Sequence, residues 1–285
     1  MNIRRSDLVL EIGSGNDPHP RADVLCDRYV ESDAERGGSI VIDRPLVEAD
    51  AQCLPFRDGA FDYVICAQVL EHVEDPERML HELMRVASRG YIETPSEIAE
   101  RLYGWPFHRS VINLVEGRLM IRRKRFQPQF GQLFHVLAAR DPAYRGFHLT
   151  HNHLFMVRYE WEGRIDFEIE SEDSTPLDLG SREFVETLCG AGGGGWRSTW
   201  LPRWRDLAPR PLAAWGKSIL ARSRRRVRPR LQDLIVCPAC RGPIAWGSEE
   251  ISCERCAAVY PVRGGIPRLV PPGPPEGGPR AGGPR

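Results

Sequence analysis

Residues 8–15 read LVLEIGSG, an apolar run that ends in two closely spaced glycines. The run from Leu8 to Ile12 has the length and composition of a buried strand and is interrupted only by Glu11. Gly13 and Gly15 permit a sharp turn and let the backbone approach a ligand without a Cβ in the way. The same pattern fits a nucleotide-binding α/β fold and a plain tight turn, so the neighbouring sequence has to distinguish them.

Further apolar segments alternate with turn and helix signals as far as about residue 95, which is typical of a parallel sheet covered by helices. Asp75-Pro76-Glu77 provides an N-cap followed by proline at the first helical position, and apolar residues then recur at helical spacing from Leu80 to Val86. The sequence therefore predicts a doubly wound, mostly parallel α/β fold, with strands at residues 8–12, 23–26, 46–49, 63–67 and 91–93.

Residues 96–150 are interpreted as an insertion within this domain, with helices over 111–115 and 132–139. From 153 to 170, β-branched and aromatic residues lie on both sides of Glu162-Gly163. This pattern predicts a β-hairpin that closes the edge of the sheet.

The rest of the chain changes in character, and four regions are predicted. Residues 1–175 form the main domain, and 176–230 form a basic, tryptophan-containing linker with one helix over 211–222. A compact ribbon follows at 231–270, and the Pro/Gly tail at 271–285 cannot bury a core.

The 285 residues contain 39 basic and 39 acidic side chains, so the net charge is +0. No global field therefore attracts the protein to nucleic acid or anionic lipid. No segment approaches the roughly 20 apolar residues of a membrane span, and the first apolar run is too short for a signal peptide. We expect a cytoplasmic protein, in which the eight cysteines are thiols or metal ligands rather than disulfides.

Acidic residues follow the second and third predicted strands. Asp27 could accept hydrogen bonds from both ribose hydroxyls of an adenosine, and the segment Asp50-Ala51-Gln52 would face the adenine edge. A dinucleotide site is disfavoured, because Pro18 stands at the third glycine of G-x-G-x-x-G and Pro20 prevents a helix from starting. Two carboxylates at successive strand ends favour a nucleoside pocket.

Residues 8–95 resemble the core of the class I S-adenosylmethionine-dependent methyltransferases, of the type 11 kind. The resemblance is carried by residues 49–86, with Leu54-Pro55-Phe56, Phe61-Asp62, Leu70-Glu71-His72, Glu82-Leu83 and Arg85-Val86. It implies a seven-stranded Rossmann-like sheet and S-adenosylmethionine as cofactor. One departure is clear: the family usually has a full helix after the glycine turn, whereas NDPHPRA at residues 16–22 leaves room only for a loop.

The same resemblance assigns residues to parts of the cofactor. The methionine end would contact Glu11, Gly13, Ser14 and Gly15, the ribose Asp27, and the adenine Asp50 and Ala51 beside Gln52. The floor near the sulfonium would be formed by Cys66 to Gln68.

Methyl transfer from a sulfonium depends on in-line placement of the acceptor and often on a general base. Histidine is the side chain best suited to that role near neutral pH, and the candidates are His72, His108, His148, His151 and His153. The resemblance places His72 beside the pocket, in a positioning or catalytic role. If the segment HLTHNH is extended, His151 and His153 share one face, as a base, a metal site or a polar edge. No N-P-P-Y-type tetrad and no catalytic cysteine pair marks the acceptor.

Four cysteines near the C-terminus form two C-x₂-C pairs, Cys237 with Cys240 and Cys253 with Cys256, separated by 12 residues. Two such pairs present four thiolates tetrahedrally, which suits a structural zinc and leaves no open coordination position. A ribbon of about 40 residues has too small a core to stand alone, so the metal contributes folding free energy.

Residues 231–270 resemble the small zinc-ribbon activator subunits that partner methyltransferases acting on tRNA and translation factors, and their bacterial relatives. The likeness lies in residues 234–238 and 260–267. It implies that the ribbon packs on its own methyltransferase domain, with Ile235, Val259 and Ile266 in the contact.

Two blocks of basic residues stand out, at 122–125 and 222–230. Each cation near a phosphate adds salt-sensitive affinity, which would suit RNA. Trp204 and Trp215 precede the second block, which would suit a membrane-surface helix. A solvated face, anionic lipid, a lipid-linked glycan and RNA remain the alternatives.

The leading hypothesis is an S-adenosylmethionine-dependent methyltransferase that acts on an oxygen or nitrogen of a small molecule or glycan-type acceptor. One alternative is that the acceptor is RNA or a protein, as the activator-like ribbon and the arginine-rich segments would suggest. Another is a non-catalytic scaffold that binds S-adenosylmethionine.

Overall fold

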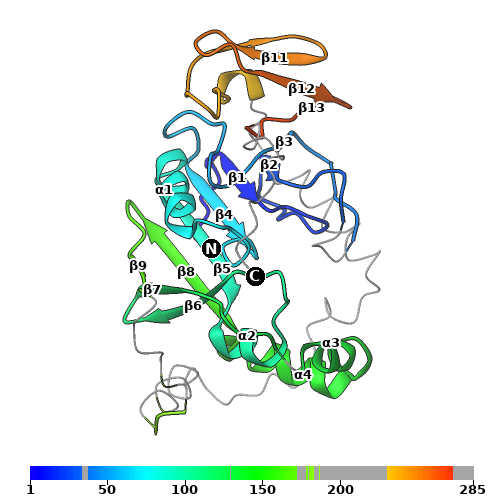
Figure 1. Cartoon of the computed structure of the whole chain (residues 1–285), viewed down its shortest axis with the longest axis vertical. Helices are drawn as coiled ribbons and strands as arrows, with labels where there is room; N and C mark the ends of the chain where they lie inside the picture. Colours follow the sequence, from blue (N-terminus) through cyan, green and yellow to red (C-terminus); the bar gives the residue numbers. More distant parts are fainter. Residues whose placement is uncertain are drawn as a thin grey trace, which may run out of the picture.

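The computed structural model describes residues 1–33, 38–128, 130–171, 178, 180–182, 186 and 230–271. Within them the main sheet has the order β3-β2-β1-β4-β5-β8, and β8 is its antiparallel member (Figure 1). The predicted mostly parallel α/β fold is confirmed, and six strands of the sheet lie in the described residues. The strands are β1 (Val9–Ile12), β2 (Val24–Asp27), β3 (Leu46–Glu48), β4 (Tyr63–Ala67), β5 (Arg89–Pro95) and β8 (Met156–Glu162).

Helix α1 (Pro76–Val86) connects β4 to β5 and confirms the prediction made from its cap. The side chain of Asp75 accepts a hydrogen bond from the backbone N–H of Arg78 at 2.9 Å, and Pro76 occupies the first helical position. The apolar side of α1, which includes Leu80 and Leu83, is buried in the core that it shares with the sheet.

A second sheet has the order β6-β7-β9, formed by β6 (Ser110–Val115), β7 (Arg118–Arg123) and β9 (Phe167–Ile169). The predicted helix over 111–115 is therefore wrong. Glu116 and Gly117 both have positive φ, +51° and +82°, and this two-residue turn joins β6 to β7 as a hairpin. The hairpin pairs the apolar run of β6 with β7, which fixes it as a strand.

The predicted hairpin around Glu162-Gly163 is also wrong, although both of its strands exist. β8 pairs antiparallel with β5 from Arg89 opposite Glu162 to Pro95 opposite Met156. β9 leaves for the second sheet, where it pairs parallel with β7. The expectation that this region closes an edge of the main sheet is confirmed by β8.

Among the described residues between β5 and β8 there are four short helices: α2 (Glu97–Tyr103), α3 (Gly131–Arg140), α4 (Pro142–Thr150) and α5 (Asn152–Phe155). The predicted helix over 132–139 is confirmed within α3. The segment HLTHNH is helical rather than extended, because its first residues end α4 and its last begin α5.

The C-terminal ribbon consists of a 3₁₀ turn (Leu231–Asp233), β10 (Ile244–Trp246), β11 (Glu250–Cys253), β12 (Val259–Arg263) and β13 (Ile266–Pro267), in the order β10-β11-β12-β13. It lies against the β3 edge of the main sheet (Figure 1). The N–H of Leu269 donates to the carbonyl of Glu48 at 2.7 Å, so the last residues of the ribbon pair with β3.

A second backbone contact joins the start of the ribbon to the loop after β3. The N–H of Val236 donates to Pro55 O, and the N–H of Arg57 donates to Leu234 O, both at 2.9 Å. Ile235 is buried in the core of the main domain, and Ile266 packs on a smaller apolar cluster that contains Leu25 of β2 and Leu46 of β3. The expected contact of Val259 is wrong, since its side chain is 54% exposed.

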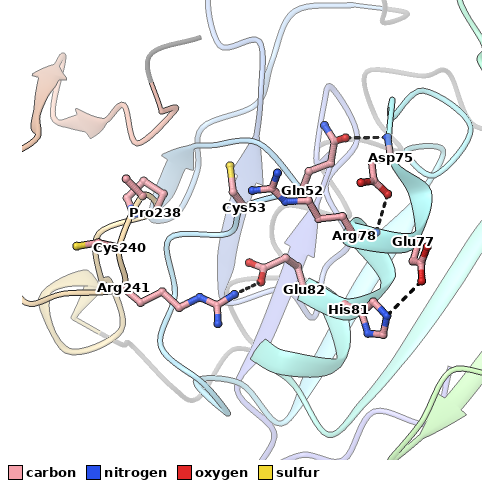
Figure 2. Close-up of a pocket in the computed structure, with 11 residues that line it drawn as sticks. Gln52, Cys53, Asp75, Glu77, Arg78, His81, Glu82, Pro238, Cys240 and Arg241 are labelled. Carbon is pink, nitrogen blue, oxygen red and sulfur yellow. Dashed lines mark hydrogen bonds and ion pairs between the residues drawn. The ribbon is translucent and has the colours of Figure 1, made fainter. Parts of the chain in front are cut away.

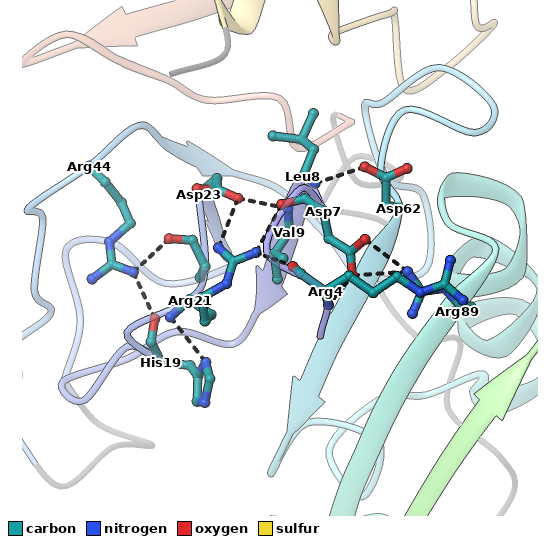
Figure 3. Close-up of polar contacts among 11 residues, drawn as sticks. Arg4, Asp7, Leu8, Val9, His19, Arg21, Asp23, Arg44, Asp62 and Arg89 are labelled. Atoms are coloured by element: carbon teal, nitrogen blue, oxygen red, sulfur yellow. Dashed lines mark hydrogen bonds and ion pairs between the residues drawn. The ribbon is translucent and has the colours of Figure 1, made fainter. Parts of the chain in front are cut away.

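The amino ends of the strands are joined by hydrogen bonds to three carboxylates, of which Asp7 and Asp23 are buried and Asp62 is exposed (Figure 3). Both oxygens of Asp7 accept hydrogen bonds from Nη2 of Arg89 at 2.9 Å. Asp23 accepts from the N–H of Val9 at 3.0 Å, and Asp62 from the N–H of Leu8 at 2.8 Å. These carboxylates thus bond to the protein's own backbone and to Arg89.

Several predicted features fall outside the described residues: the helix over 211–222, residues 222–229 of the second basic block, nearly all of the linker at 176–230, and the tail from 272. Among the helices that the structure does describe, none combines the length and the apolar character that crossing a membrane requires.

Candidate cofactor site and zinc ribbon

The carboxyl ends of the parallel strands bring the predicted cofactor residues together. β1 is flanked by β2 on one side and β4 on the other, so the strand order reverses there. In open α/β sheets a crevice forms outside the strand ends at this point, and ligands bind in it. The turn after β1 and the residue after β4 are next to it.

The glycine turn after β1 requires glycine for two reasons. Gly13 and Gly15 have φ of +70° and +50°, in the left-handed region. A Cβ on Gly13 would also lie 2.2 Å from Cγ2 of Val69, so the segment after β4 packs directly against the turn. Ser14 between them is buried, and its Oγ has no hydrogen-bond partner among the described residues. That hydroxyl is available to a ligand.

Asp27, the last residue of β2, holds the glycine turn in place. Its Oδ2 accepts the N–H of Gly15 at 3.0 Å, and its Oδ1 accepts the N–H of Tyr29 at 3.1 Å. An ionised carboxylate accepts up to about four hydrogen bonds. Asp27 therefore fits the predicted contact with a ribose diol.

Asp50 lies two residues beyond β3 and is fixed from both sides. Its Oδ1 accepts the N–H and the side-chain amide of Gln52 at 2.9 and 3.0 Å, and its Oδ2 pairs with Arg28 at 2.9 Å. Gln52 in turn accepts the N–H of Asp75 at 2.8 Å, which links this loop to the cap of α1. Ala51 is buried beside them.

Glu11 is a buried carboxyl within β1. Its Oε2 accepts the N–H of His19 at 2.8 Å. Burial raises the pKa of Glu11 to about 8, and the His19 N–H and the Arg44 charge only partly oppose this. A ligand ammonium would satisfy the ionised form, so Glu11 fits the amino group at the methionine end.

The end of β4 contributes backbone rather than side chains. Cys66 is fully buried in the core, and burial raises the pKa of its thiol well above the ordinary value. Gln68 has φ of +58°, and its N–H donates to Glu93 O at 2.8 Å. Gln68 thus turns the chain directly after β4, where the floor near the sulfonium is predicted.

Taken in order, these residues fit S-adenosylmethionine: a buried carboxyl, a glycine turn with a spare hydroxyl, a carboxylate after β2 and a polar loop after β3. The expected departure from the family is confirmed, since residues 16–22 form turns and no helix. The sequence had not indicated two supporting residues, Val69 behind the glycine turn and Arg28 beside Asp50.

His72 lies close to this edge, four residues after Gln68. Its ring stacks on Phe107 at 5.5 Å between centroids and meets the ring of His108 edge-on at 4.6 Å. Burial lowers the pKa of His72 to about 4, so the imidazole is neutral at pH 7. Phe107 stacks further on Trp105, which is 44% exposed, and an aromatic surface thus extends from His72 outward.

The other candidate histidines belong to the helices before β8. His148 Nε2 lies 2.9 Å from Tyr144 Oη, and His151 Nδ1 lies 3.0 Å from Phe147 O. The rings of His151 and His153 are 6.4 Å apart. Because the segment is helical, the expectation of one shared extended face is wrong, and these contacts fit the alternative of a satisfied polar edge.

A groove of about 600 Å³ separates the start of α1 from the ribbon (Figure 2). Gln52 and Cys53 line it from the loop after β3, and Glu82 and Arg241 form an ion pair across it at 2.9 Å. The groove thus lies between the proposed adenine end of the cofactor site and the metal-binding end of the ribbon.

The four predicted zinc ligands converge. All four sulfurs lie within 4.8 Å of one another, with Cys237 to Cys256 at 3.7 Å and Cys240 to Cys253 at 3.4 Å. The N–H groups of residues 255 and 256 point at Cys253 Sγ at 3.3 and 3.4 Å, as suits a thiolate. This donor set fits a tetrahedral structural zinc.

The two C-x₂-C pairs form matching turns. Arg241 N–H donates to Cys237 O at 2.7 Å, and Ala257 N–H donates to Cys253 O at 3.1 Å. Arg241 and Ala257, each directly after the second cysteine of its pair, both have φ of +57°. This repeated geometry aims two sulfurs from each turn at one point.

Two family models match the chain. A methyltransferase domain matches residues 14–92, and a Trm112p-like protein matches residues 228–265. Together with the four-cysteine cluster, they define the class: the chain contains a methyltransferase domain followed by a Trm112p-like region.

Particular relatives match only part of the chain. A norajmaline N-methyltransferase of Rauvolfia serpentina is 46% identical over 41 residues, which are 14% of this chain and 14% of that enzyme. A UPF0434 protein of Burkholderia thailandensis is 40% identical over 43 residues, 14% of this chain and 63% of that protein. The chain thus spans less than two thirds of each of these relatives.

Solved structures show similar partial coverage. A complex containing the Haloferax volcanii Trm112 methyltransferase activator matches 33% of this chain and 47% of that one, with 22% identity and a TM-score of 0.26. The YcgJ protein of Bacillus subtilis gives 23% identity, the same coverage and a TM-score of 0.26.

Proposed function

We propose that this protein is an S-adenosylmethionine-dependent methyltransferase that acts on an oxygen or nitrogen of a small molecule or glycan-type acceptor. The observation that carries the proposal is the convergence of the glycine turn, Asp27 and Asp50 at one edge of the sheet, where the hydroxyl of Ser14 has no protein partner. When bound, the cofactor supplies a methyl group on a sulfonium, and the protein has to place the acceptor in line with it.

The acceptor class is proposed from the surroundings of His72. The stacked rings of His72, Phe107 and Trp105 offer a flat apolar surface, which suits an aromatic or sugar ring. The neutral imidazole of His72 could position an acceptor hydroxyl or amine, or accept its proton. His151 and His153 remain weaker candidates, since their described contacts are with α4 and with each other.

The ribbon is proposed to act on its own methyltransferase domain. Its backbone bonds reach Glu48 in β3 and Pro55 and Arg57 in the loop that follows Asp50. Arg268 also pairs with Glu48 at 3.2 Å and with Glu31 in the loop after Asp27 at 2.5 Å. Both loops that present a carboxylate to the cofactor are thus held by the ribbon, as a structural support for cofactor binding.

An RNA or protein acceptor is the second candidate, and the Trm112p-like region favours it. The first basic block does not add to it, because Arg122 pairs with the buried Glu97 at 2.6 Å and Lys124 with the buried Glu100 at 2.7 Å. Salt-dependent RNA binding by the full chain, with a steep loss of affinity as salt rises, would favour this candidate.

The first test is isothermal titration of the zinc-loaded chain with S-adenosylmethionine and S-adenosylhomocysteine. We expect micromolar binding that Asp27→Ala and Asp50→Ala each weaken at least about tenfold, because each removes a charge-assisted hydrogen bond to the ligand. Asp58→Ala, a change at an exposed carboxylate on the ribbon side, is the matched control. Absence of binding to the folded wild type would contradict the proposal.

Binding alone does not separate an enzyme from a scaffold. Incubation with cofactor labelled in the methyl group, against pools of small molecules, glycans, RNA and proteins, distinguishes them. Label transfer to the first two pools supports the leading proposal, transfer to RNA or protein supports the second candidate, and tight cofactor binding without transfer to any pool supports a scaffold.

A further inference from the structure

Three potential metal ligands meet beside the cofactor edge, apart from the four cysteines. One ligand atom each from Glu71, His72 and His108 lies within 4.8 Å of the other two. Glu71 and His72 follow β4, whereas His108 precedes β6. The carbonyl of Glu71 accepts the N–H of Arg109 at 2.7 Å, and this backbone bond brings the two segments together.

Glu71 has one oxygen that the protein uses and one that it does not. The side chain is only 1% exposed. Its Oε2 accepts the hydroxyl of Thr94 at 3.0 Å, while its Oε1 has no hydrogen-bond partner among the described residues and lies 3.9 Å from His72 Nε2. A buried carboxylate oxygen without a partner is costly, and coordination of a cation is one of the few ways to satisfy it.

His108 is oriented for coordination by a neighbouring carboxylate. Its Nδ1 lies 2.5 Å from Oε1 of Glu100, and Oε2 of Glu100 accepts Lys124 Nζ at 2.7 Å. All three side chains are buried. Metal-binding histidines commonly donate their second ring N–H to such a carboxylate, which fixes the tautomer and leaves the other nitrogen, here Nε2, for the metal.

The charges also favour a cation. Lys124 pairs with Glu100, whereas no lysine or arginine of the described residues forms an ion pair with Glu71. The ring of His72 closes the third side, and its side chain is 20% exposed, so the cluster is reached from the solvent on that side. A metal could therefore enter without unfolding the surrounding core.

We propose that Glu71, His72 and His108 form a binding site for a divalent first-row transition metal. Two imidazoles and one carboxylate suit Mn²⁺, Fe²⁺ or Zn²⁺ and leave coordination positions open to outside ligands. Glu100 and Lys124 orient His108, and Thr94 orients Glu71. That an oxygen of the methyl acceptor completes the coordination is a further step, which rests on the proposed function.

The test uses the full chain with zinc already bound to the four cysteines, so that added metal does not compete for the ribbon. Mn²⁺ is titrated alone, and free Mn²⁺ is followed by electron paramagnetic resonance. We expect one Mn²⁺ to bind per chain. No Mn²⁺ bound to the folded protein at millimolar concentrations, or binding that Glu71→Gln leaves unchanged, would overturn the site.

Three variants locate the metal. Glu71→Gln keeps the shape of the side chain, and His72→Ala removes a partly exposed ligand, so a folding defect in one leaves the other informative. Each should weaken Mn²⁺ binding at least tenfold, and Glu100→Gln about tenfold or more through the orientation of His108. His81→Ala is the control, since His81 is 62% exposed on α1, and it should bind like the wild type.

Circular dichroism confirms the fold of each variant. Titration of the same preparations with S-adenosylhomocysteine separates the two proposals. Metal binding without cofactor binding supports the site and contradicts the proposed function, whereas cofactor binding without metal binding supports the function and overturns the site.

Discussion

The buried carboxylates of this protein differ in how far the protein itself satisfies them. At the amino ends of the strands, Asp7 pairs with Arg89, and Asp23 pairs with Arg21 and accepts the N–H of Val9. Glu11 lies in the middle of β1 with one backbone N–H, that of His19, as its described hydrogen-bond donor. The carboxylate of Glu11 is therefore poorly solvated in the free protein, which a positively charged ligand would correct.

The raised pKa of Glu11 predicts a pH-dependent stability. Its pKa is 4.5 when the chain is unfolded and about 8 when it is folded, so the folded state binds more protons between these values. Stability should therefore fall as pH rises from about 4.5 to about 8. Glu11→Gln removes this effect, and the wild type should lose a few kcal/mol relative to it, since one pKa unit is about 1.4 kcal/mol.

Urea denaturation of both proteins at about pH 5.5 and about pH 8.5 measures the difference. The same substitution should weaken S-adenosylmethionine binding, because it removes the carboxylate that we propose as the partner of the cofactor's ammonium group. Parallel stability curves for the two proteins across this range would contradict the pKa assignment.

Glu82 on α1 connects three segments through one side chain. Its two oxygens accept from the N–H of Leu54, from the Arg85 guanidinium at 2.7 Å and from Arg241 in the ribbon. Removing one partner of a buried ion pair costs about 3 to 5 kcal/mol, because the other charge stays buried. We expect Glu82→Ala to cost about that much.

The control for Glu82 is Glu77→Ala on the same helix, where both partners of the pair with His81 are 62% exposed. Exposed pairs contribute at most about 1 kcal/mol. Thermal melts measure the stability of both variants. Equal melting temperatures would show that the bonds of Glu82 do not stabilise the fold more than an exposed pair does.

At the scale of elements, the sequence predicted those whose signals are local. The cap at Asp75 and the apolar spacing of α1 set its bounds, and the parallel strands are apolar because both of their faces are buried. The run at 111–115 is too short to separate helix from strand by its periodicity. The signal that identifies it is Glu116-Gly117, a two-residue hairpin turn between two apolar runs.

The candidate site was predictable to the extent that it follows from strand ends. Asp27 and Asp50 could be assigned because carboxyl ends of parallel strands meet at one edge. The contact of His108 with Glu71 could not, because it depends on a backbone bond between residues far apart in the sequence, Arg109 and Glu71. Contacts of that kind are set by the tertiary fold and produce no periodic pattern in the sequence.

The pairing of the ribbon with the β3 edge predicts unequal effects of two apolar truncations. Leu269 is fully buried next to its backbone bond to Glu48, whereas Val259 on β12 is 54% exposed. Leu269→Ala should destabilise the protein by about 2 to 5 kcal/mol, through lost burial and the cavity that remains. Val259→Ala should change stability by less than about 0.5 kcal/mol. Urea denaturation of both variants measures these values, and equal effects would mean that this contact does not stabilise the fold.

At the scale of the whole molecule, the ribbon and the methyltransferase domain share one hydrophobic core. Leu234, Ile251 and Tyr260 of the ribbon belong to the same buried cluster as Leu54 and Phe56. A ribbon of about 40 residues is too small to fold without its metal. Loss of zinc should therefore uncover apolar surface on the main domain as well.

This shared core predicts that zinc removal acts at a distance. A chelator, or Cys253→Ser, should unfold the ribbon and lower the melting temperature of the whole protein, because binding free energy of the metal is folding free energy. Either change should also weaken S-adenosylhomocysteine binding, because Arg268 and the backbone of residues 234–236 would no longer hold the loops after Asp27 and Asp50. Glu254→Ala, a change at an exposed residue between the two cysteines of the second pair, is the control. Calorimetry should show one transition for the zinc-loaded protein, and cofactor affinity that survives chelation would mean that the main domain supports its loops without the ribbon.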